Sequence, residues 1–126
     1  MKRVTGIGGI FFSAKDPEVL QAWYKSHLGI DVQEWGGTTF RWVNEAGTPA
    51  NGTTVWSIGD GSSFVPSSAP FMINYRVADL HALLKALRKE GCHVIDNVDE
   101  SEYGKFGWVM DPEGNRIELW QPPDGQ

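Results

Sequence analysis

Residues 110–120 read MDPEGNRIELW, and this stretch decides how the rest of the chain is interpreted. The DPEG tetrapeptide at residues 111–114 is typical of a tight turn, because Asp can bond its own backbone, Pro fixes φ and Gly accepts a positive φ. The segments on either side, 108–110 and 116–120, have the composition of strands, so the sequence predicts a β-hairpin. Glu118 is a carboxylate between apolar residues of the second strand, and its surroundings therefore bear directly on function.

The bulk composition is that of a single globular domain. The chain has 126 residues, of which 40% are hydrophobic and 21% are charged. Its net charge of −5 and the lack of a basic cluster argue against a nucleic-acid partner. The single cysteine, Cys92, leaves no internal disulfide. No signal-peptide pattern and no apolar stretch of membrane-spanning length is present, so we expect a soluble cytoplasmic protein with no membrane partner.

A helix bounded by an aspartate and a glycine is predicted twice. Asp16 begins the first helix, which ends at Gly29, and Asp79 begins the second helix, which ends at Gly91. The two starts are 63 residues apart and the two ends 62 residues apart. Strand patterns surround both helices, at residues 4–14, 30–35, 38–43, 53–58, 71–77, 92–96, 108–110 and 116–120.

This repeat predicts that the whole chain, residues 1–126, forms one α+β domain built from two βαβββ modules. The modules span residues 4–59 and 70–121. Residues 60–69, which are rich in Ser, Gly and Pro, form the linker between them.

The chain resembles the vicinal oxygen chelate superfamily in its two capped helices and in the closing DPEGN…IEL motif at residues 111–119. That superfamily includes glyoxalase I, bleomycin-resistance proteins, fosfomycin-resistance enzymes and extradiol dioxygenases. The resemblance covers nearly the whole chain. It implies curled mixed sheets around a shared concave cleft, and a homodimer.

The metal-dependent members of the superfamily take ligands from the first and last strand of each module. The resemblance places these four positions at Gly9, Trp56, Met72 and Glu118, of which only Glu118 carries a typical metal ligand. Divalent ions need several nitrogen or oxygen donors, which glycine, a thioether and an indole N–H do not provide. The histidines fall elsewhere, at positions 27, 81 and 93. We therefore expect no bound metal and no cofactor.

Alternation along the strands assigns side chains to the cleft, although a shift of one residue would reverse any assignment. The expected ligand-binding residues are mostly aromatic, with few polar groups: Phe11, Trp42, Trp56, Met72, Asn74, Arg76, Trp108, Arg116, Glu118 and Trp120. The alternation leaves the faces of Trp42 and Trp108 open. An unpaired buried carboxylate is costly, so we expect Arg76 or Arg116 to be the partner of Glu118.

This cleft composition predicts a pocket for a flat or apolar organic molecule. The first hypothesis is a metal-free protein that binds a small aromatic or drug-like ligand, with the net negative charge favouring a cationic one. The second is a metal-dependent lyase or dioxygenase of the glyoxalase type, which would need ligands from other positions. The third is a metal-free enzyme in which Glu118 is the catalytic general base and an arginine stabilises an oxyanion. Whether the two modules pair within one chain or between two chains also stays open.

Overall fold

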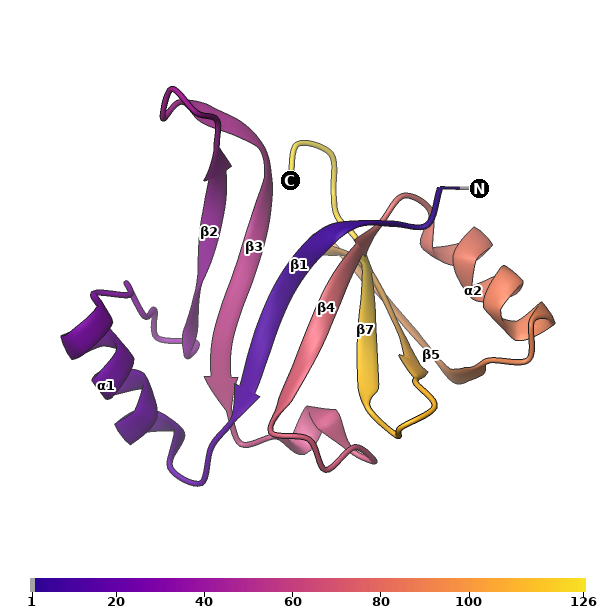
Figure 1. Ribbon diagram of the computed structural model, residues 1–126, viewed down its shortest axis with the longest axis horizontal. Helices are drawn as coiled ribbons and strands as arrows, with labels where there is room; N and C mark the ends of the chain where they lie inside the picture. Colours follow the sequence, from indigo (N-terminus) through magenta and orange to yellow (C-terminus); the bar gives the residue numbers. More distant parts are fainter. Residues whose placement is uncertain (1) are drawn as a thin grey trace.

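The computed structural model describes residues 2–126, which form seven strands in one curled mixed sheet, two α-helices and one short 3₁₀ helix (Figure 1). In chain order the elements are β1 (Val4–Ser13), α1 (Pro17–Leu28), β2 (Gly37–Val43), β3 (Pro49–Gly59), η1 (Ser62–Phe64), β4 (Phe71–Val77), α2 (Leu80–Lys89), β5 (His93–Ser101), β6 (Gly104–Met110) and β7 (Arg116–Gln121). The strand order is β2-β3-β1-β4-β7-β6-β5. The predicted α+β fold is confirmed. Neither α-helix of the described chain has the length and apolar character needed to cross a membrane.

The two modules join at the middle of the sheet, where β1 and β4 pair in antiparallel orientation. Within each module the first and last strands are parallel neighbours: β1 pairs with β3 and β4 pairs with β7. In these pairs Gly9 lies opposite Val55 and Asn74 lies opposite Glu118. In the described chain the two modules are therefore joined through β1 and β4.

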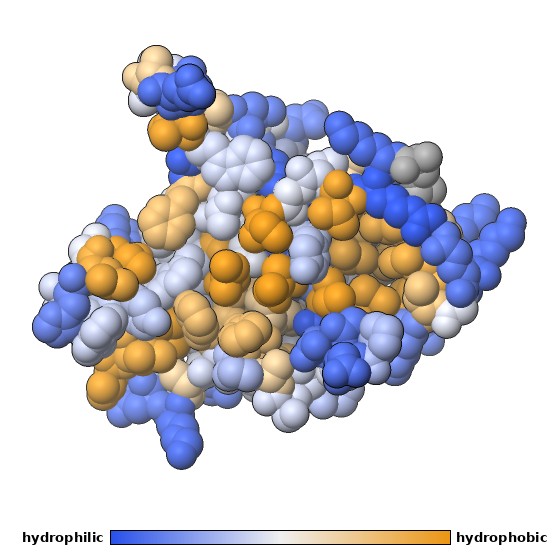
Figure 2. Space-filling view, viewed as in Figure 1, coloured by the Kyte–Doolittle hydropathy of each residue, from blue (hydrophilic) through white to orange (hydrophobic). Residues whose placement is uncertain are grey.

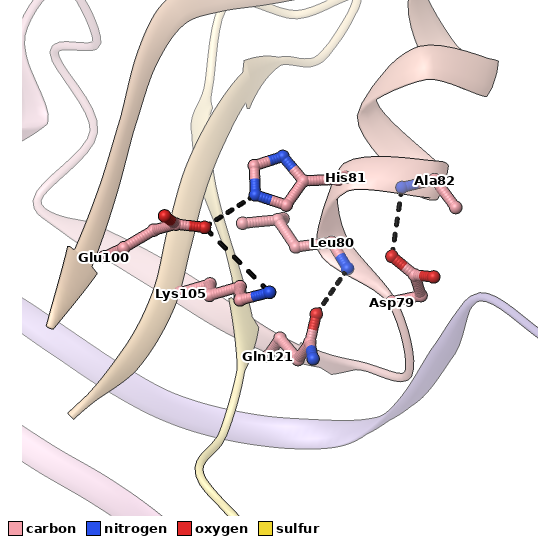
Figure 3. A network of polar contacts seen from close by, with 7 residues as sticks. All are labelled: Asp79, Leu80, His81, Ala82, Glu100, Lys105 and Gln121. Atoms are coloured by element: carbon pink, nitrogen blue, oxygen red, sulfur yellow. Dashed lines mark hydrogen bonds and ion pairs between the residues drawn. The ribbon is translucent and has the colours of Figure 1, made fainter. Parts of the chain in front are cut away.

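Both helix starts have the predicted caps. The Asp16 carboxylate accepts a hydrogen bond from the Val19 backbone at 3.2 Å, and the Asp79 carboxylate accepts one from the Ala82 backbone at 3.1 Å (Figure 3). Each bond satisfies one of the free N–H groups of a first helical turn.

Helix α2 packs firmly on the second half of the sheet. Leu80, Leu83 and Leu84 form an apolar stripe along this helix and are buried against Val109 and Leu119. Figure 3 shows how the start of α2 is tied to β7, because the backbone N–H of Leu80 donates to Gln121 Oε1 at 2.9 Å. The same view shows His81 and Lys105 both directed at Oε1 of the Glu100 carboxylate.

Helix α1 packs much less closely, and no residue of it is buried. Tyr24 contacts Phe12 and Trp56, and Gln21 Nε2 donates to the Ile58 carbonyl at 2.8 Å. Trp23, by contrast, is 50% exposed. Helix α1 meets the sheet mainly at β3, so apolar side chains on its outer face stay exposed.

Three segments differ from the sequence-based expectation. Residues 30–35, predicted as a strand, form turns that lead to Gly36, so the first module has two strands after its helix. Strand β5 is longer than expected and leaves only residues 102–103 for the turn to β6. The linker 60–69 contains η1, whose Phe64 is buried against Met72 and Trp108. That segment is therefore anchored to the sheet.

Candidate functional site

The surface of the molecule is unevenly apolar. Figure 2 shows apolar side chains gathered over the middle of the visible face and, separately, around the end where α1 lies, with polar residues towards the periphery. The sheet carries two cavities on its concave side, and they share Phe11 as a common wall.

Glu118 is the polar centre of the first cavity. Asn74 Nδ2 donates to Glu118 Oε1 at 2.6 Å, and Trp108 Nε1 donates to Oε2 at 2.9 Å. The residue is only 9% exposed. Burial raises the pKa of this carboxyl, opposed by the hydrogen bonds from Asn74 and Trp108 and by the nearby charge of Arg116.

The expectation that an arginine pairs with Glu118 is wrong, because an amide and an indole N–H occupy its two oxygens. Arg116 instead donates to the Val65 carbonyl at 2.7 Å and lies over the Trp108 ring, 5.1 Å from the ring centroid. Trp108 therefore faces the cleft, which the sequence had left open.

The Glu118 pocket, as we call the first cavity, has a volume of about 270 Å³. Its wall combines apolar and small polar side chains, among them Phe11, Ser57, Asp60, Ser63, Met72 and Glu118. Several of these belong to β3 and to the segment that follows it. The pocket thus lies at the end of the sheet near η1.

The aromatic pocket, the second cavity, has a volume of about 520 Å³. Aromatic and other apolar side chains dominate its wall: Phe11, Trp35, Val55, Tyr103, Phe106 and Trp120. The polar residues of this wall are Thr39, Thr53, Asn74 and Gln126. This is the larger of the two cavities and the more apolar in composition.

Arg76 lies beside the aromatic pocket within a stack of rings. Its guanidinium carbon is 4.9 Å from the Trp42 ring centroid and 5.2 Å from that of Trp120. Trp120 stacks in turn on Phe106, with 6.0 Å between ring centroids. Arg76 Nη1 donates to the Thr53 carbonyl at 3.0 Å. The sequence also leaves the face of Trp42 open, and the contact with Arg76 places its ring on the cleft side of the sheet.

Trp56 does not lie in the cleft, and that prediction is wrong. Its ring contacts Tyr24 of α1 and Phe12, so it lies on the helix side of the sheet, while the adjacent Val55 lines the aromatic pocket. The alignment of Trp56 with Glu118 was shifted by one residue, and such a shift moves a side chain to the opposite face.

The other predicted site residues fall into two groups. Phe11, Met72 and Glu118 line the Glu118 pocket, and Phe11, Asn74 and Trp120 line the aromatic pocket. The sequence-based reasoning missed Trp35, Thr39, Thr53, Val55, Phe106 and Gln126. Phe106 is two residues before Trp108 on β6 and shares its face, so it could be placed only once the face of Trp108 was known.

The donor set of the cleft does not fit a divalent metal ion. Phe11 lies 63 residues before Asn74, the spacing of the repeat, so Ser57, which lies opposite Phe11, occupies the register position in the first module that Glu118 occupies in the second. A serine hydroxyl is not one of the Cys, His, Asp or Glu ligands that Zn²⁺ takes. Within residues 2–126, no three His, Cys, Asp or Glu side chains lie close enough together to hold an ion. Two of the histidines lie on the helices, with His27 near Trp23 and His81 beside Glu100.

Comparison with solved structures finds the same fold in several proteins. A methylmalonyl-CoA epimerase in complex with methylmalonyl-CoA and ammonium is 18% identical, with 98% of each chain covered and a TM-score of 0.67. The methylmalonyl-CoA epimerase of Mycobacterium tuberculosis is 19% identical over 95% of this chain and 89% of that one, with a TM-score of 0.61. A glyoxalase/bleomycin resistance protein/dioxygenase superfamily member from Vibrio splendidus is 14% identical over 91% and 97%, with a TM-score of 0.58.

At these identities the structural likeness shows the fold alone. No curated protein sequence matches the chain significantly. A family model does match it: the glyoxalase-like domain aligns with residues 9–120, which include both modules and the cleft between them. The chain therefore belongs to the glyoxalase-like domain family.

Proposed function

We propose that this protein binds a small, flat and largely apolar organic molecule in the aromatic pocket, without a metal ion. The observation that carries the proposal is the pocket itself, whose volume of about 520 Å³ lies within the usual range for small-molecule sites. Phe11, Phe106 and Trp120 supply ring faces and edges on which a planar ligand can stack.

Two unsatisfied polar atoms in the wall support binding of a ligand with a polar edge. Asn74 Oδ1 and Thr53 Oγ1 are buried, and neither has a hydrogen-bond partner in the described chain. Buried polar groups are nearly always paired in folded proteins. A shift of either side chain towards the pocket would expose its polar atom: an N–H or O–H group on the ligand would then satisfy Asn74 Oδ1, and the Thr53 hydroxyl would donate or accept.

The proposal is tested by titrating the protein with 2-naphthamide, a planar probe with an amide at its edge, in an isothermal calorimeter. Saturable binding to the wild type and its loss in Val55→Trp, which fills the pocket, are expected. Lys89→Gln, at the far end of α2, is the control and should bind like the wild type. Absence of binding to the wild type, or unchanged binding to Val55→Trp, would reject the proposal.

A second candidate function is a metal-free enzyme in which Glu118 is a general base. The specific observation in its favour is that burial raises the pKa of Glu118 at the wall of a cavity, which makes its carboxylate a stronger base than an exposed glutamate. Two of the similar structures are epimerases of an acyl-CoA ester. The test measures the incorporation of deuterium from D₂O into methylmalonyl-CoA. If Glu118 is a general base, the wild type should catalyse this exchange and Glu118→Gln should not.

We also propose that the protein is a homodimer that uses the outer face of α1. Val19 and Trp23 on this helix are 65% and 50% exposed, and a cluster of exposed apolar side chains is typical of an interaction surface. Light scattering of the purified protein should give the mass of two chains, and Trp23→Glu should give the mass of one. A wild-type monomer at micromolar concentration would contradict this proposal.

A further inference from the structure

The Glu118 pocket has an acidic wall. Glu118 and Asp60 both line it, and no Lys, Arg or His of the described chain does. None of the ion pairs among residues 2–126 includes either carboxylate. The hydroxyls of Ser57 and Ser63 add further oxygen atoms that can accept hydrogen bonds. The wall thus carries negative charge without a cation of its own.

Glu118 has acceptor capacity to spare. An ionised carboxylate has about four lone-pair sites, and Glu118 accepts one hydrogen bond from Asn74 and one from Trp108, both of them neutral donors. Burial raises the pKa of this group, an effect that the charge of Arg116 opposes and that of Asp99 reinforces. A buried carboxylate is stabilised by a cation in contact with it, so a ligand with a positive charge would supply what this wall lacks.

Asp60 adds a second negative charge to the outer part of the wall. This exposed residue directly follows β3, and its carboxylate accepts a hydrogen bond from the Ser62 backbone N–H at 2.9 Å. Hydrogen bonds from Ser62 lower the pKa of Asp60 below its ordinary value of 3.8. The group is therefore ionised at neutral pH, where it would attract a cation to the pocket.

The rest of the wall suits carbon atoms more than a bare ion. Phe11, Phe64 and Met72 line the pocket, and Phe64 and Met72 are buried in their own core cluster with Trp108. Aromatic rings attract cations at their faces and also pack against apolar groups. The volume of about 270 Å³ far exceeds the ~30 Å³ that one water molecule occupies in the liquid. A small organic molecule would fill this space, and a single ion would not.

We propose that the Glu118 pocket binds the protonated amino group of a small organic amine, with the ammonium on the Glu118 carboxylate and the carbon skeleton against Phe11 and Phe64. A primary ammonium has three N–H donors, which match the acceptors on Glu118, Ser57 and Ser63. The net charge of −5 favours the same sign of ligand charge. This is a second site beside the aromatic pocket, and the proposal does not depend on what that pocket binds.

The test compares benzylamine, which is protonated at pH 7.5, with benzyl alcohol, a neutral molecule of nearly the same shape. NMR spectra of ¹⁵N-labelled protein follow the indole N–H of Trp108, which is identified by its absence in Trp108→Phe. In the wild type this signal should shift saturably, and benzylamine should bind about 10- to 100-fold more tightly than the alcohol, as expected for a charge-assisted hydrogen bond.

Two variants make the same change of charge at different places. In Glu118→Gln the preference for benzylamine should disappear, because a neutral amide replaces the carboxylate. Glu45→Gln is the matched control and should keep the preference. Glu45 lies on the turn between β2 and β3, at the opposite end of β3 from Ser57.

The outcomes separate this site from the aromatic pocket. No saturable shift with benzylamine, equal affinities of the wild type for the two probes, or a preference that survives in Glu118→Gln would each overturn the proposal. Val55→Trp fills the aromatic pocket and should still bind benzylamine, and loss of binding there would place the amine in the aromatic pocket instead. Failure of 2-naphthamide to bind would reject the proposed function and leave the amine site in place. The comparison of the two probes in the wild type does not depend on the folding of any variant.

Discussion

Asn74 and Glu118 lie opposite each other on the parallel strands β4 and β7, and the amide of Asn74 donates to the carboxylate of Glu118 at 2.6 Å. Asn74 lines the aromatic pocket and Glu118 lines the Glu118 pocket, so one hydrogen bond connects the walls of the two cavities. Glu118 accepts its hydrogen bonds from neutral N–H donors and has no ion pair within the described chain. The cost of burying its charge therefore outweighs the stabilisation by these bonds, and its pKa is raised.

The Glu118→Gln substitution should change how stability depends on pH. The pKa of Glu118 is raised above the ordinary value of 4.5, so the folded state binds this proton more tightly than the unfolded state does. The tighter binding of this proton therefore stabilises the folded state fully below pH 4.5, and that stabilisation is lost as the pH rises through the raised folded pKa.

Urea unfolding of wild type and Glu118→Gln at several pH values measures this effect. The variant loses one hydrogen bond, because its amide NH₂ cannot accept from Asn74 or Trp108, and should be less stable by about 1–3 kcal/mol at low pH. The deficit should shrink as the pH rises above 4.5 and through the raised folded pKa, because only the wild type carries the cost of an ionised Glu118. A deficit that grows with pH would contradict the raised pKa.

Val55→Trp and Trp56→Phe should separate the two faces of β3. Val55 lines the aromatic pocket, so the larger side chain should abolish binding of 2-naphthamide with little change in the unfolding midpoint. Trp56 packs on Tyr24 and Phe12, so its truncation should lower the free energy of unfolding by about 1–3 kcal/mol and leave affinity unchanged. Calorimetry and urea unfolding of both variants check this, and a loss of affinity in Trp56→Phe would place that ring in the cleft after all.

Gly8→Ala should disturb the cleft through Asn74. A Cβ at this position would lie 2.1 Å from Asn74 Oδ1 and 2.9 Å from Trp120 Cε3, so both side chains must move. We expect a loss of about 1–3 kcal/mol in unfolding free energy together with weaker binding of 2-naphthamide. Gly59→Ala, where a Cβ would meet no atom within 4 Å, is the matched control. Equal stability of the two variants would show that the cleft is not packed as described.

Leu84→Ala should test the packing of α2. This side chain is 1% exposed in the main core, and its truncation should cost about 2–5 kcal/mol in urea unfolding. Val65→Ala removes methyl groups from a side chain that is 60% exposed and should change stability by less than about 0.5 kcal/mol. A small effect of Leu84→Ala would mean that the second module has a different core.

The sequence was informative wherever the pattern was local. The two Asp-capped helices and the β6–β7 hairpin follow from residue type and spacing, and the structure has both. Residues 30–35 have the composition of a strand, yet they turn back on themselves ahead of Gly36. Composition alone does not decide whether an apolar segment finds a neighbouring strand, because that depends on tertiary pairing.

The site was harder to predict than the fold. The face of Glu118 could be read from alternation within its own strand, but the face of Trp56 depended on an alignment between two modules with few identical residues. The partners of Glu118 and the stack around Arg76 arise from strand register and from contacts between residues distant in sequence, such as Arg76 with Trp42. No local pattern encodes them.

The most direct test of the proposed metal-free binding is calorimetric titration of 2-naphthamide into protein treated with EDTA, together with elemental analysis of the same preparation. We predict saturable binding of one probe per chain, equal before and after chelation, and no stoichiometric divalent metal. One metal ion per chain that is lost in Glu118→Gln, or binding that requires added metal, would contradict the account and favour a metal-dependent enzyme of the glyoxalase type.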